Sequence, residues 1–574
     1  MARATRRRFL QTAGAVTGSL LLGSGGGSAA SHESDDLFAS EDAWPTSQGT
    51  AGRTRATTAA GPTGPYLETD WSHSTPDVSG DLTSESPVIA DGVVYSAAVS
   101  SIEFSQGWIT AYDVASGEIL WRRKQASTES GESVPVGAPR SQPVVSDGSV
   151  YFAGGGEVEN NSETHTGLAG IYALDAASGE IQWHRSNLSS ATTVEATDGR
   201  VYFDRGALDA DTGRSIWEVD ESGPLVGVAG NTMYRRSWDR DSDTAFIVAR
   251  DATTGEKRWQ REPLNQIIGT AATADTLYVT SRTSGEEPSY STYALSGTNG
   301  SVEWRSPVPI RGTSPTTTYT VGDISETEIT VDRDPHVSVP AADESRVYVL
   351  THSYTEGWFP GPSMSQSDYY DSQSALYAFD RSSGEELWRF ETPIQAEAAP
   401  TVTDETVYFA GNYKKRDAIY ALDAKTGTKR WVAGIPNRSW LISSPSIANN
   451  DLFMFIQRPM LDGYIYKFEA TECGKSVPDE GARTVRNDSD GGADQTDLKT
   501  SPPSRSASTS AVEETDLLTQ EAGRSSNAAS WHTSDESLSS TQKHDWRSPL
   551  AFVGGLGLSA GALLTDRSPL NRDT

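Results

Sequence analysis

Apolar and polar positions alternate in short runs along most of the chain, and the runs come in pairs. The first kind of pair encloses a two-residue turn, as in SPVIADGVVYSA (86–97), QPVVSDGSVYFAG (142–154) and APTVTDETVYFAG (399–411). Alternation with a period of two and enrichment in Val, Ile, Tyr and Phe indicate β-strands. Asp-Gly between two such runs is typical of a tight hairpin turn. The pattern therefore predicts a recurring strand–turn–strand unit.

A second pair of strands follows the first in most repeats, as in ITAYDVASGEILW (109–121), IYALDAASGEIQW (171–183) and LYAFDRSSGEELW (376–388). Within it, Asp175 can accept hydrogen bonds from nearby backbone amides, and Gly179 can adopt the positive φ that the turn needs. A closing Trp falls at a fixed position of the last strand, which predicts packing between neighbouring sheets. These residues are Trp121, Trp183, Trp217, Trp259, Trp304, Trp388 and Trp431.

Four antiparallel strands per repeat predict the blades of a β-propeller. Eight first halves can be counted, and the last, SPSIANNDLFMFI (444–456), continues into YIYKFEA (464–470) without reaching a Trp of its own. Trp71, in YLETDWSHS, precedes the first pair and has no strands of its own. We therefore predict an all-β, eight-bladed propeller over residues 66–473 whose last blade is completed by the N-terminal strand, which removes two open edges.

The 574 residues carry 47 Lys and Arg against 78 Asp and Glu, a formal net charge of −31. Such a surface repels polyphosphates, so nucleic acid is not expected as a partner. Only ten of the basic residues are lysines. This composition resembles that of proteins from salt-loving archaea, although an acidic secreted protein would also fit. Cys473 is the single cysteine, so no intramolecular disulfide can form.

Both ends of the chain differ from the repeats. Residues 1–30 resemble a twin-arginine export signal, with Arg6 and Arg7 before a short apolar stretch and small residues at 28–30. Residues 31–65 form a lead-in. Residues 474–546 are rich in Ser, Thr and Asp and predict a disordered stalk. Residues 547–574 are weakly apolar, either a membrane anchor or a tail with no membrane role. We expect an extracellular or cell-surface location.

The repeated A-x-D-x-x-x-G-x-x-x-W pattern is similar to the tryptophan-docking motif of pyrroloquinoline quinone (PQQ) alcohol dehydrogenases and their relatives. WPTSQGTAGRT (44–54) resembles the W-P-x-x-x-x-D-x-x-x-T lead-in of the PQQ-like propellers that include BamB. The resemblance covers roughly residues 44–473. It implies the fold, and either a protein-binding scaffold or a quinoprotein dehydrogenase.

In the dehydrogenases of this family, the quinone lies near the ring axis against a disulfide of adjacent cysteines. A calcium ion, held by acidic and amide side chains, lies beside a catalytic Asp. One cysteine cannot supply that disulfide, and no motif in this chain matches the calcium ligands or the base. No catalytic or cofactor-binding residue is therefore assigned, and PQQ and calcium belong only to the dehydrogenase alternative.

Strand order places the Asp-Gly and Asp-x-x-x-Gly turns at one end of the ring, the lower end. Connections between middle strands and between blades lie at the upper end. Length variation is confined to the upper end, at 155–168, 235–245, 305–338 and 351–375. Long loops on a rigid ring are a usual place for a binding site, and we expect 351–375 to be the main contact. Aromatic residues there could contact a partner or simply fold the loops onto the ring: Trp238, Trp358, Phe359, Tyr369 and Tyr370.

Other motifs for chemistry fail or are absent. Asp239, Asp241 and Asp243 imitate the start of a calcium loop, but Thr244 and Arg250 stand where an EF-hand needs Gly and Glu. A looser cation site or a solvated acidic loop remain as interpretations. The eight histidines are scattered, which argues against zinc. The chain has no G-x-S-x-G, phosphate loop or nucleotide fingerprint.

The leading interpretation is an exported, monomeric PQQ-like propeller that binds a surface or secreted protein through its upper end. The alternative is a PQQ-dependent dehydrogenase that oxidises alcohols or sugars. A sugar-binding propeller is a third interpretation, supported only by the loop aromatics.

Overall fold

The computed structural model describes these residues of the chain: 39–75, 86–99, 107–127, 131, 133–155, 157–160, 163–188, 191–221, 223–239, 244–261, 264, 266–283, 288–310, 317–320, 328–331, 335–356, 371–396, 398–413, 416–435, 441–457, 463–471 and 482–486.

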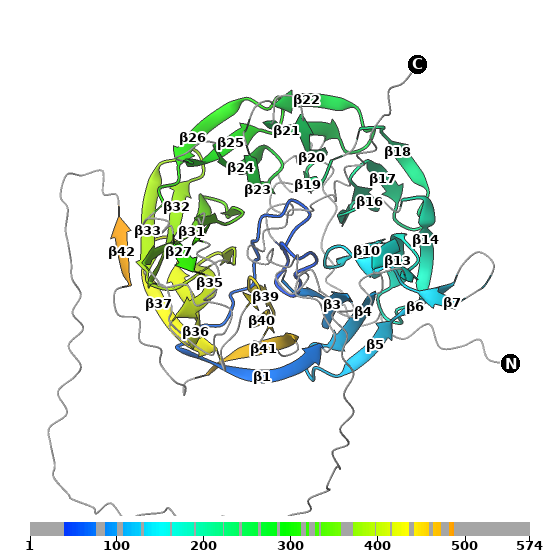
Figure 1. Ribbon diagram of the computed structural model, residues 1–574, viewed down its shortest axis with the longest axis horizontal. Coiled ribbons are helices and arrows are strands. Elements are labelled where there is room, and N and C mark those ends of the chain that lie inside the picture. The colour runs from blue at the N-terminus through cyan, green and yellow to red at the C-terminus, as the bar shows by residue number, and fades with distance from the viewer. Residues whose placement is uncertain are drawn as a thin grey trace, which may run out of the picture. The chain divides into compact units, whose positions relative to one another are not determined.

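Eight antiparallel sheets form a closed propeller ring, as predicted (Figure 1). In each sheet the first strand lies nearest the ring axis and the fourth lies on the rim. The strands are, for blade 1, β2 (Val88–Ala90), β3 (Val93–Val99), β4 (Gly107–Asp113) and β5 (Ile119–Arg123); for blade 2, β8 (Ala138–Pro139) with β9 (Val144–Ser146), β10 (Ser149–Gly155), β13 (Gly170–Asp175) and β14 (Ile181–Arg185); for blade 3, β15 (Val194–Thr197), β16 (Arg200–Phe203), β17 (Gly206–Asp209) and β18 (Ser215–Glu218); for blade 4, β19 (Leu225–Ala229), β20 (Thr232–Asp239), β21 (Thr244–Asp251) and β22 (Lys257–Arg261); for blade 5, β23 (Gln266–Ala272), β24 (Thr276–Arg282), β25 (Tyr290–Ser296) and β26 (Val302–Pro307); for blade 6, β29 (His336–Val337) with β30 (Ala341–Ala342), β31 (Arg346–Glu356), β32 (Asp371–Asp380) and β33 (Glu386–Thr392); for blade 7, β34 (Thr401–Val402), β35 (Thr406–Tyr413), β36 (Arg416–Asp423) and β37 (Lys429–Ile435); and for blade 8, β38 (Leu441–Ile442) with β39 (Ser446–Ala448), β40 (Asp451–Gln457), β41 (Gly463–Thr471) and β1 (Tyr66–Thr75).

The short turns have the conformations that their sequences predict. Asp147 and Gly148 join β9 to β10 with φ of 49° and 73°, the positive pair required by a two-residue hairpin turn. Asp175 accepts hydrogen bonds at Oδ1 from the amide and hydroxyl of Ser178, both at 2.9 Å. Gly179 follows with φ of 67°. These turns hold the strand ends of the lower end in a fixed register.

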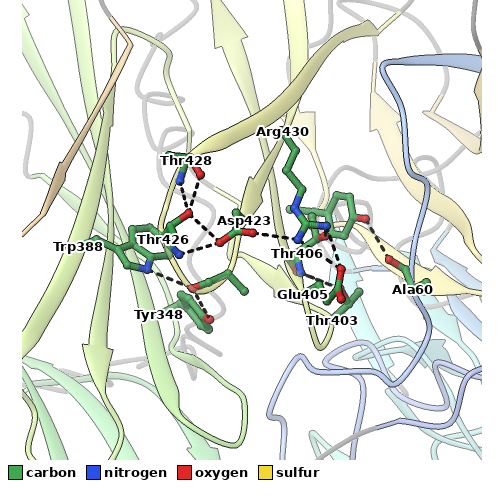
Figure 2. Close-up of polar contacts among 12 residues, drawn as sticks. Ala60, Tyr348, Trp388, Thr403, Glu405, Thr406, Asp423, Thr426, Thr428 and Arg430 are labelled. Carbon is green, nitrogen blue, oxygen red and sulfur yellow. Dashed lines mark hydrogen bonds and ion pairs between the residues drawn. The ribbon is translucent and has the colours of Figure 1, made fainter. Parts of the chain in front are cut away.

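The closing tryptophans dock each blade onto the next, as predicted. Trp388 of blade 6 donates its Nε1–H to the Ala424 carbonyl of blade 7 at 3.1 Å, and Tyr348 packs on its ring at 5.9 Å (Figure 2). Seven tryptophans make this bond to the following blade at 2.8–3.1 Å: Trp71, Trp121, Trp183, Trp217, Trp259, Trp304 and Trp388. Each of these seven rings covers the glycine of the neighbouring turn.

The N-terminal strand closes the ring, which confirms the predicted eighth blade. β1 pairs antiparallel with β41 from Tyr66 opposite Thr471 to Thr75 opposite Gly463. Lys467 of β41 binds Asp70 of β1 at 2.7 Å. Trp431 of blade 7 meets no turn glycine of blade 8, because the outer strand there comes from the other end of the chain. Gly64 takes that place, and a Cβ there would lie 2.3 Å from the indole.

Several upper connections are shorter than the sequence suggested, because strand pairing continues into them. β20 runs through Trp238 to Asp239, so the expected loop 235–245 is largely a hairpin. β31 runs to Glu356 and β32 begins at Asp371, so both ends of the expected loop 351–375 are strand. Three further hairpins occupy upper connections: β6 (Gln125–Ser127) with β7 (Ser133–Pro135), β11 (Glu157–Asn160) with β12 (Glu163–Thr166), and β27 (Thr317–Thr320) with β28 (Glu328–Val331).

Two segments outside the predicted ring belong to it. Residues 39–65, expected as a lead-in, contribute to its interior. Arg483–Arg486, expected in the stalk, form β42, a fifth strand on the rim of blade 6. No helix among the described residues is long and apolar enough to span a membrane.

Candidate functional site

The lead-in forms a second, smaller circuit inside the ring, and we call residues 39–58 the inner loop (Figure 1, dark blue). Its backbone visits the innermost strands in the same order as the blades. The bonds, all of 2.7–2.9 Å, join Glu41 to Asn449 of blade 8, Trp44 to Ile89 of blade 1, Pro45 to Val145 of blade 2, Ala51 to Val228 of blade 4, Gly52 to Ala272 of blade 5, Thr54 to Ala342 of blade 6 and Arg55 to Val402 of blade 7.

The inner loop also closes on itself and reaches the remaining blade. Ala39 donates to the Ala56 carbonyl at 2.8 Å and accepts from the Thr58 amide at 3.0 Å. Arg53 forms an ion pair with Glu195 of blade 3, Nε to Oε1, at 2.8 Å. Every blade is therefore bonded to this one segment, so the segment acts as a hub for the innermost strands.

Local sequence explains why this segment fits so narrow a space. Trp44 is fully buried against blades 1 and 8. Gly52 passes the Ala272 carbonyl so closely that a Cβ would lie 2.2 Å from that oxygen, which only glycine allows. Thr50 stands at the Asp position of the W-P-x-x-x-x-D-x-x-x-T motif and bonds to Thr54, Oγ1 to Oγ1, at 3.0 Å. Small side chains let the backbone itself supply most of the contacts.

Arginine side chains of the inner loop fill the ring interior. Arg55, which is 4% exposed, donates to the Pro400 carbonyl and to Ser86 Oγ, both at 3.1 Å, and so spans blades 7 and 1. Arg236 of blade 4 donates to the Ile267 carbonyl of blade 5 at 3.2 Å. Burial first, and then the nearby charge of Arg53, lower the pKa of Arg236. Guanidinium groups therefore lie inside the ring although the whole chain is acidic.

The residues that line this interior do not fit the quinone and calcium centre implied by the family resemblance. That centre needs adjacent cysteines and a group of acidic and amide ligands near the axis. The inner loop covers the innermost strands here, and Glu195 is already paired with Arg53. The described residues contain no cluster of three or more His, Cys, Asp or Glu side chains able to hold a metal ion. Cys473 lies outside them.

One of the predicted contact residues, Trp238, lies within the described part of the chain. Trp238 lies near the tip of the β20–β21 hairpin, opposite Ala245, with 47% of its surface exposed. The described structure therefore leaves this aromatic ring largely uncovered. Trp358, Phe359, Tyr369 and Tyr370 lie outside the described residues, as do Asp241 and Asp243 of the failed calcium motif and the export residues Arg6 and Arg7.

Sequence reasoning identified the blade-docking tryptophans but not the role of residues 39–58. This segment has no strand periodicity, and its bonds go to residues up to 408 positions away, as between Glu41 and Asn449. The usable signal was its composition: one buried Trp followed by closely spaced Gly and Thr. Small residues allow close contacts between backbones, but they do not indicate which strands the segment contacts.

A family model described as outer membrane protein assembly factor BamB matches residues 66–207, 205–324 and 334–458. No curated protein matches the chain by sequence.

Solved structures with a similar arrangement include quinone enzymes and BamB. A europium-containing methanol dehydrogenase shares 13% identity over 75% of this chain and 98% of its own, with a TM-score of 0.44. The quinohemoprotein alcohol dehydrogenase of Comamonas testosteroni shares 16% identity over 76% of this chain and 82% of its own, with a TM-score of 0.45. BamB from Moraxella catarrhalis shares 13% identity over 70% of this chain and 99% of its own, with a TM-score of 0.41. At identities this low, nothing about activity transfers from these proteins.

Proposed function

Because the chain belongs to the PQQ-like propeller family of outer membrane protein assembly factor BamB, we propose that it is a protein-binding scaffold. Its partner is a surface or secreted protein, and the contact is made by the upper end of the ring. The observation that carries this proposal is the distribution of extra structure over the two ends of the blades.

Within the described residues, the structure added to the connections of the ring lies at the upper end; β42, on the rim of blade 6, is a separate addition. The additions at the upper end are the β6–β7, β11–β12 and β27–β28 hairpins and the extended β20–β21 and β31–β32 pairs. In blades 1 to 7 the first lower turn has two or three residues and the second has five. A rigid ring that varies at only one end is typical of a scaffold whose loops make the contacts.

Trp238 is the best placed contact residue among those described. An exposed Trp on a firm hairpin offers a large apolar surface at small entropic cost, and such residues often dominate interface energy. The net charge of −31 favours a partner that carries basic groups around an apolar patch.

The dehydrogenase alternative finds less support in the ring interior. The inner loop bonds to every blade, and its arginines bind Glu195, the Pro400 carbonyl and Ser86 Oγ. Titration of the purified chain with PQQ and calcium, followed by Trp fluorescence and dye-coupled oxidation of alcohols and sugars, should give no saturable quenching. Saturable quenching with turnover would favour the enzyme over the scaffold.

A photo-crosslinking amino acid at Trp238 tests the scaffold directly. We expect a discrete crosslinked partner in intact cells, and loss of that product when residues 357–370 are replaced by a short Gly-Ser linker. This replacement leaves strands β31 and β32 intact, so the melting temperature should stay nearly unchanged. The matched control places the crosslinker at Gly148 of a lower turn, where nothing lies within 4 Å. Equal crosslinking at both ends would contradict the proposal.

A further inference from the structure

Blade 6 carries a fifth strand on its outer edge, and this strand comes from the C-terminal side of the ring. β42 pairs antiparallel with β33, with Arg483 opposite Glu391, Thr484 opposite Phe390 and Arg486 opposite Trp388. The chain leaves blade 8 at Thr471 and returns to the rim two blades earlier. Among the described strands, the other seven blades end at their fourth strand.

Polar contacts accompany the backbone pairing. Arg483 reaches Glu391 Oε2 from both Nε and Nη2 at 2.8 Å. Thr484 donates to the Gly427 carbonyl at 2.8 Å, and Arg486 donates to the Thr426 carbonyl at 3.3 Å. Both carbonyls belong to the turn of blade 7, so the strand bridges two blades on the rim.

The fifth strand adds little to the hydrophobic core. None of its four residues is buried, and the Arg483 side chain is 68% exposed. Removal of β42 would therefore cost backbone bonds and polar contacts rather than core packing. Strands held this way can exchange with other extended segments.

β33, the strand that pairs with β42, is held in place by its own side chains. Trp388 and Phe390 of β33 are buried in the core between blades 6 and 7. Glu391, whose side chain is 4% exposed, binds Arg389 of its own strand through Oε1 at 2.9 Å, and Arg389 also binds Glu386 at 2.8 Å. Oε2 of Glu391 is the oxygen that Arg483 takes. The nearly buried carboxylate of Glu391 thus favours an arginine at this position of the added strand.

We propose that the outer edge of blade 6 is a strand-acceptor site for an extended, arginine-bearing segment of a partner protein, and that β42 covers this site until the partner displaces it. The partner strand pairs antiparallel with β33 and places an arginine on Glu391. The site lies on the rim and does not depend on a contact at the upper end. A tethered strand has a high effective concentration, so the covered edge admits only a competitor that binds more tightly.

The test compares the full chain with a Thr484→Pro/Val485→Pro variant. Proline has no amide hydrogen and cannot complete an antiparallel ladder, so β42 should leave the edge. The probe is a fluorescein-labelled peptide of residues 481–487, followed by anisotropy. We expect the proline variant to bind it at least tenfold more tightly than the full chain does. Hydrogen exchange of residues 386–392 should rise in the variant and fall again with peptide.

Two controls distinguish specific binding at Glu391 from non-specific pairing of the peptide with an exposed strand edge. A peptide with Arg483→Glu should lose at least tenfold in affinity, and Glu391→Gln in the proline background should remove the preference between the two peptides. Equal melting temperatures establish that the variants are folded. Unchanged hydrogen exchange at 386–392, or no gain in peptide binding, would overturn the proposal. A dimer of the full chain that depends on β42 would also overturn it, because the occupant would then be a second copy.

Discussion

At the scale of single residues, the repeat combines a turn and an interface. An Asp, or Ser296 in blade 5, begins the turn whose next residue presents a carbonyl to the Trp of the preceding blade, and the glycine four residues later lies under that Trp. Arg258 and Arg430 add a side-chain bond to the turn Asp of their own blades at 2.7 and 3.0 Å (Figure 2 for Arg430). One short motif thus sets both local conformation and blade docking.

Gly179 and Gly148, in the two turns of blade 2, separate the need for a positive φ from the need for space beside a Trp ring. Both have positive φ, but a Cβ on Gly179 would lie 2.5 Å from the Trp121 ring, whereas Gly148 faces open space. We expect Gly148→Ala to cost about 1 kcal/mol of unfolding free energy for strain alone. Gly179→Ala should cost about 2 kcal/mol more, because the indole must shift. Denaturant unfolding of both variants checks this, and equal costs would argue against the packing role.

Asp251 gives a pH dependence of known sign. Its bond to Arg258 lowers its pKa to about 2, assisted by the amides of Thr254 and Thr253 and opposed by partial burial. Because the folded pKa lies below the unfolded value of about 3.9, this stability is complete above pH ~4 and disappears as the pH falls towards 2.

Asp251→Asn should therefore lower the melting temperature by about 1–2 °C at pH 7 and by progressively less between pH 4 and 2. Asp211→Asn, at an exposed position of the blade 3 turn, is the matched control and should change little at any pH. A deficit of Asp251→Asn that persisted at pH 2 would show that the carboxylate charge is not its cause.

At the scale of elements, the ring has two closures of different kinds. β1 joins the last blade at the rim through a long antiparallel ladder, while the inner loop joins the innermost strands through single bonds to each blade. Both come from the N-terminal side of the first blade. The innermost strands, some of only two or three residues, have no inner neighbour in their own sheets, and the inner loop supplies part of the missing pairing.

The coupling energy of the Arg53–Glu195 pair tests whether the inner loop is anchored to blade 3 by a buried ion pair. Both side chains are nearly buried, at 13% and 5% exposure, so removal of one partner leaves a charge in a poorly hydrated site. We expect Glu195→Gln or Arg53→Met to cost about 3 kcal/mol each, and the double variant to cost clearly less than the sum. The control cycle uses Arg430 and Glu405, at 35% and 79% exposure, where coupling should stay below about 0.5 kcal/mol. Similar coupling in both cycles would contradict a buried hub.

At the scale of the whole molecule, the net charge of −31 sets the conditions for stability. Repulsion among the acidic groups opposes a closed ring, and salt screens it because the Debye length falls from about 10 Å at 0.1 M to about 3 Å at 1 M. This agrees with the prediction of a salt-loving source, which stays a prediction.

We expect the melting temperature to rise by on the order of 10 °C between 0.1 and 2 M potassium chloride at pH 7. At pH 4.6, near the sequence pI, the same salt step should have a smaller effect because the net charge is close to zero. Equal salt effects at the two pH values would show that screening of net charge is not the cause.

The sequence determined the blades, because each repeat encodes its own turns and its own docking Trp within about forty residues. Asp-Gly turns, Asp-x-x-x-Gly turns and the unpaired Trp71 sufficed to predict eight blades and their closure. The sequence did not determine the inner loop or β42. Both are placed mainly by backbone pairing with residues distant in the chain, such as Gly52 with Ala272 and Thr484 with Phe390. Backbone bonds carry no side-chain pattern, so only the closed ring, which brings these strands together, decides where such segments lie.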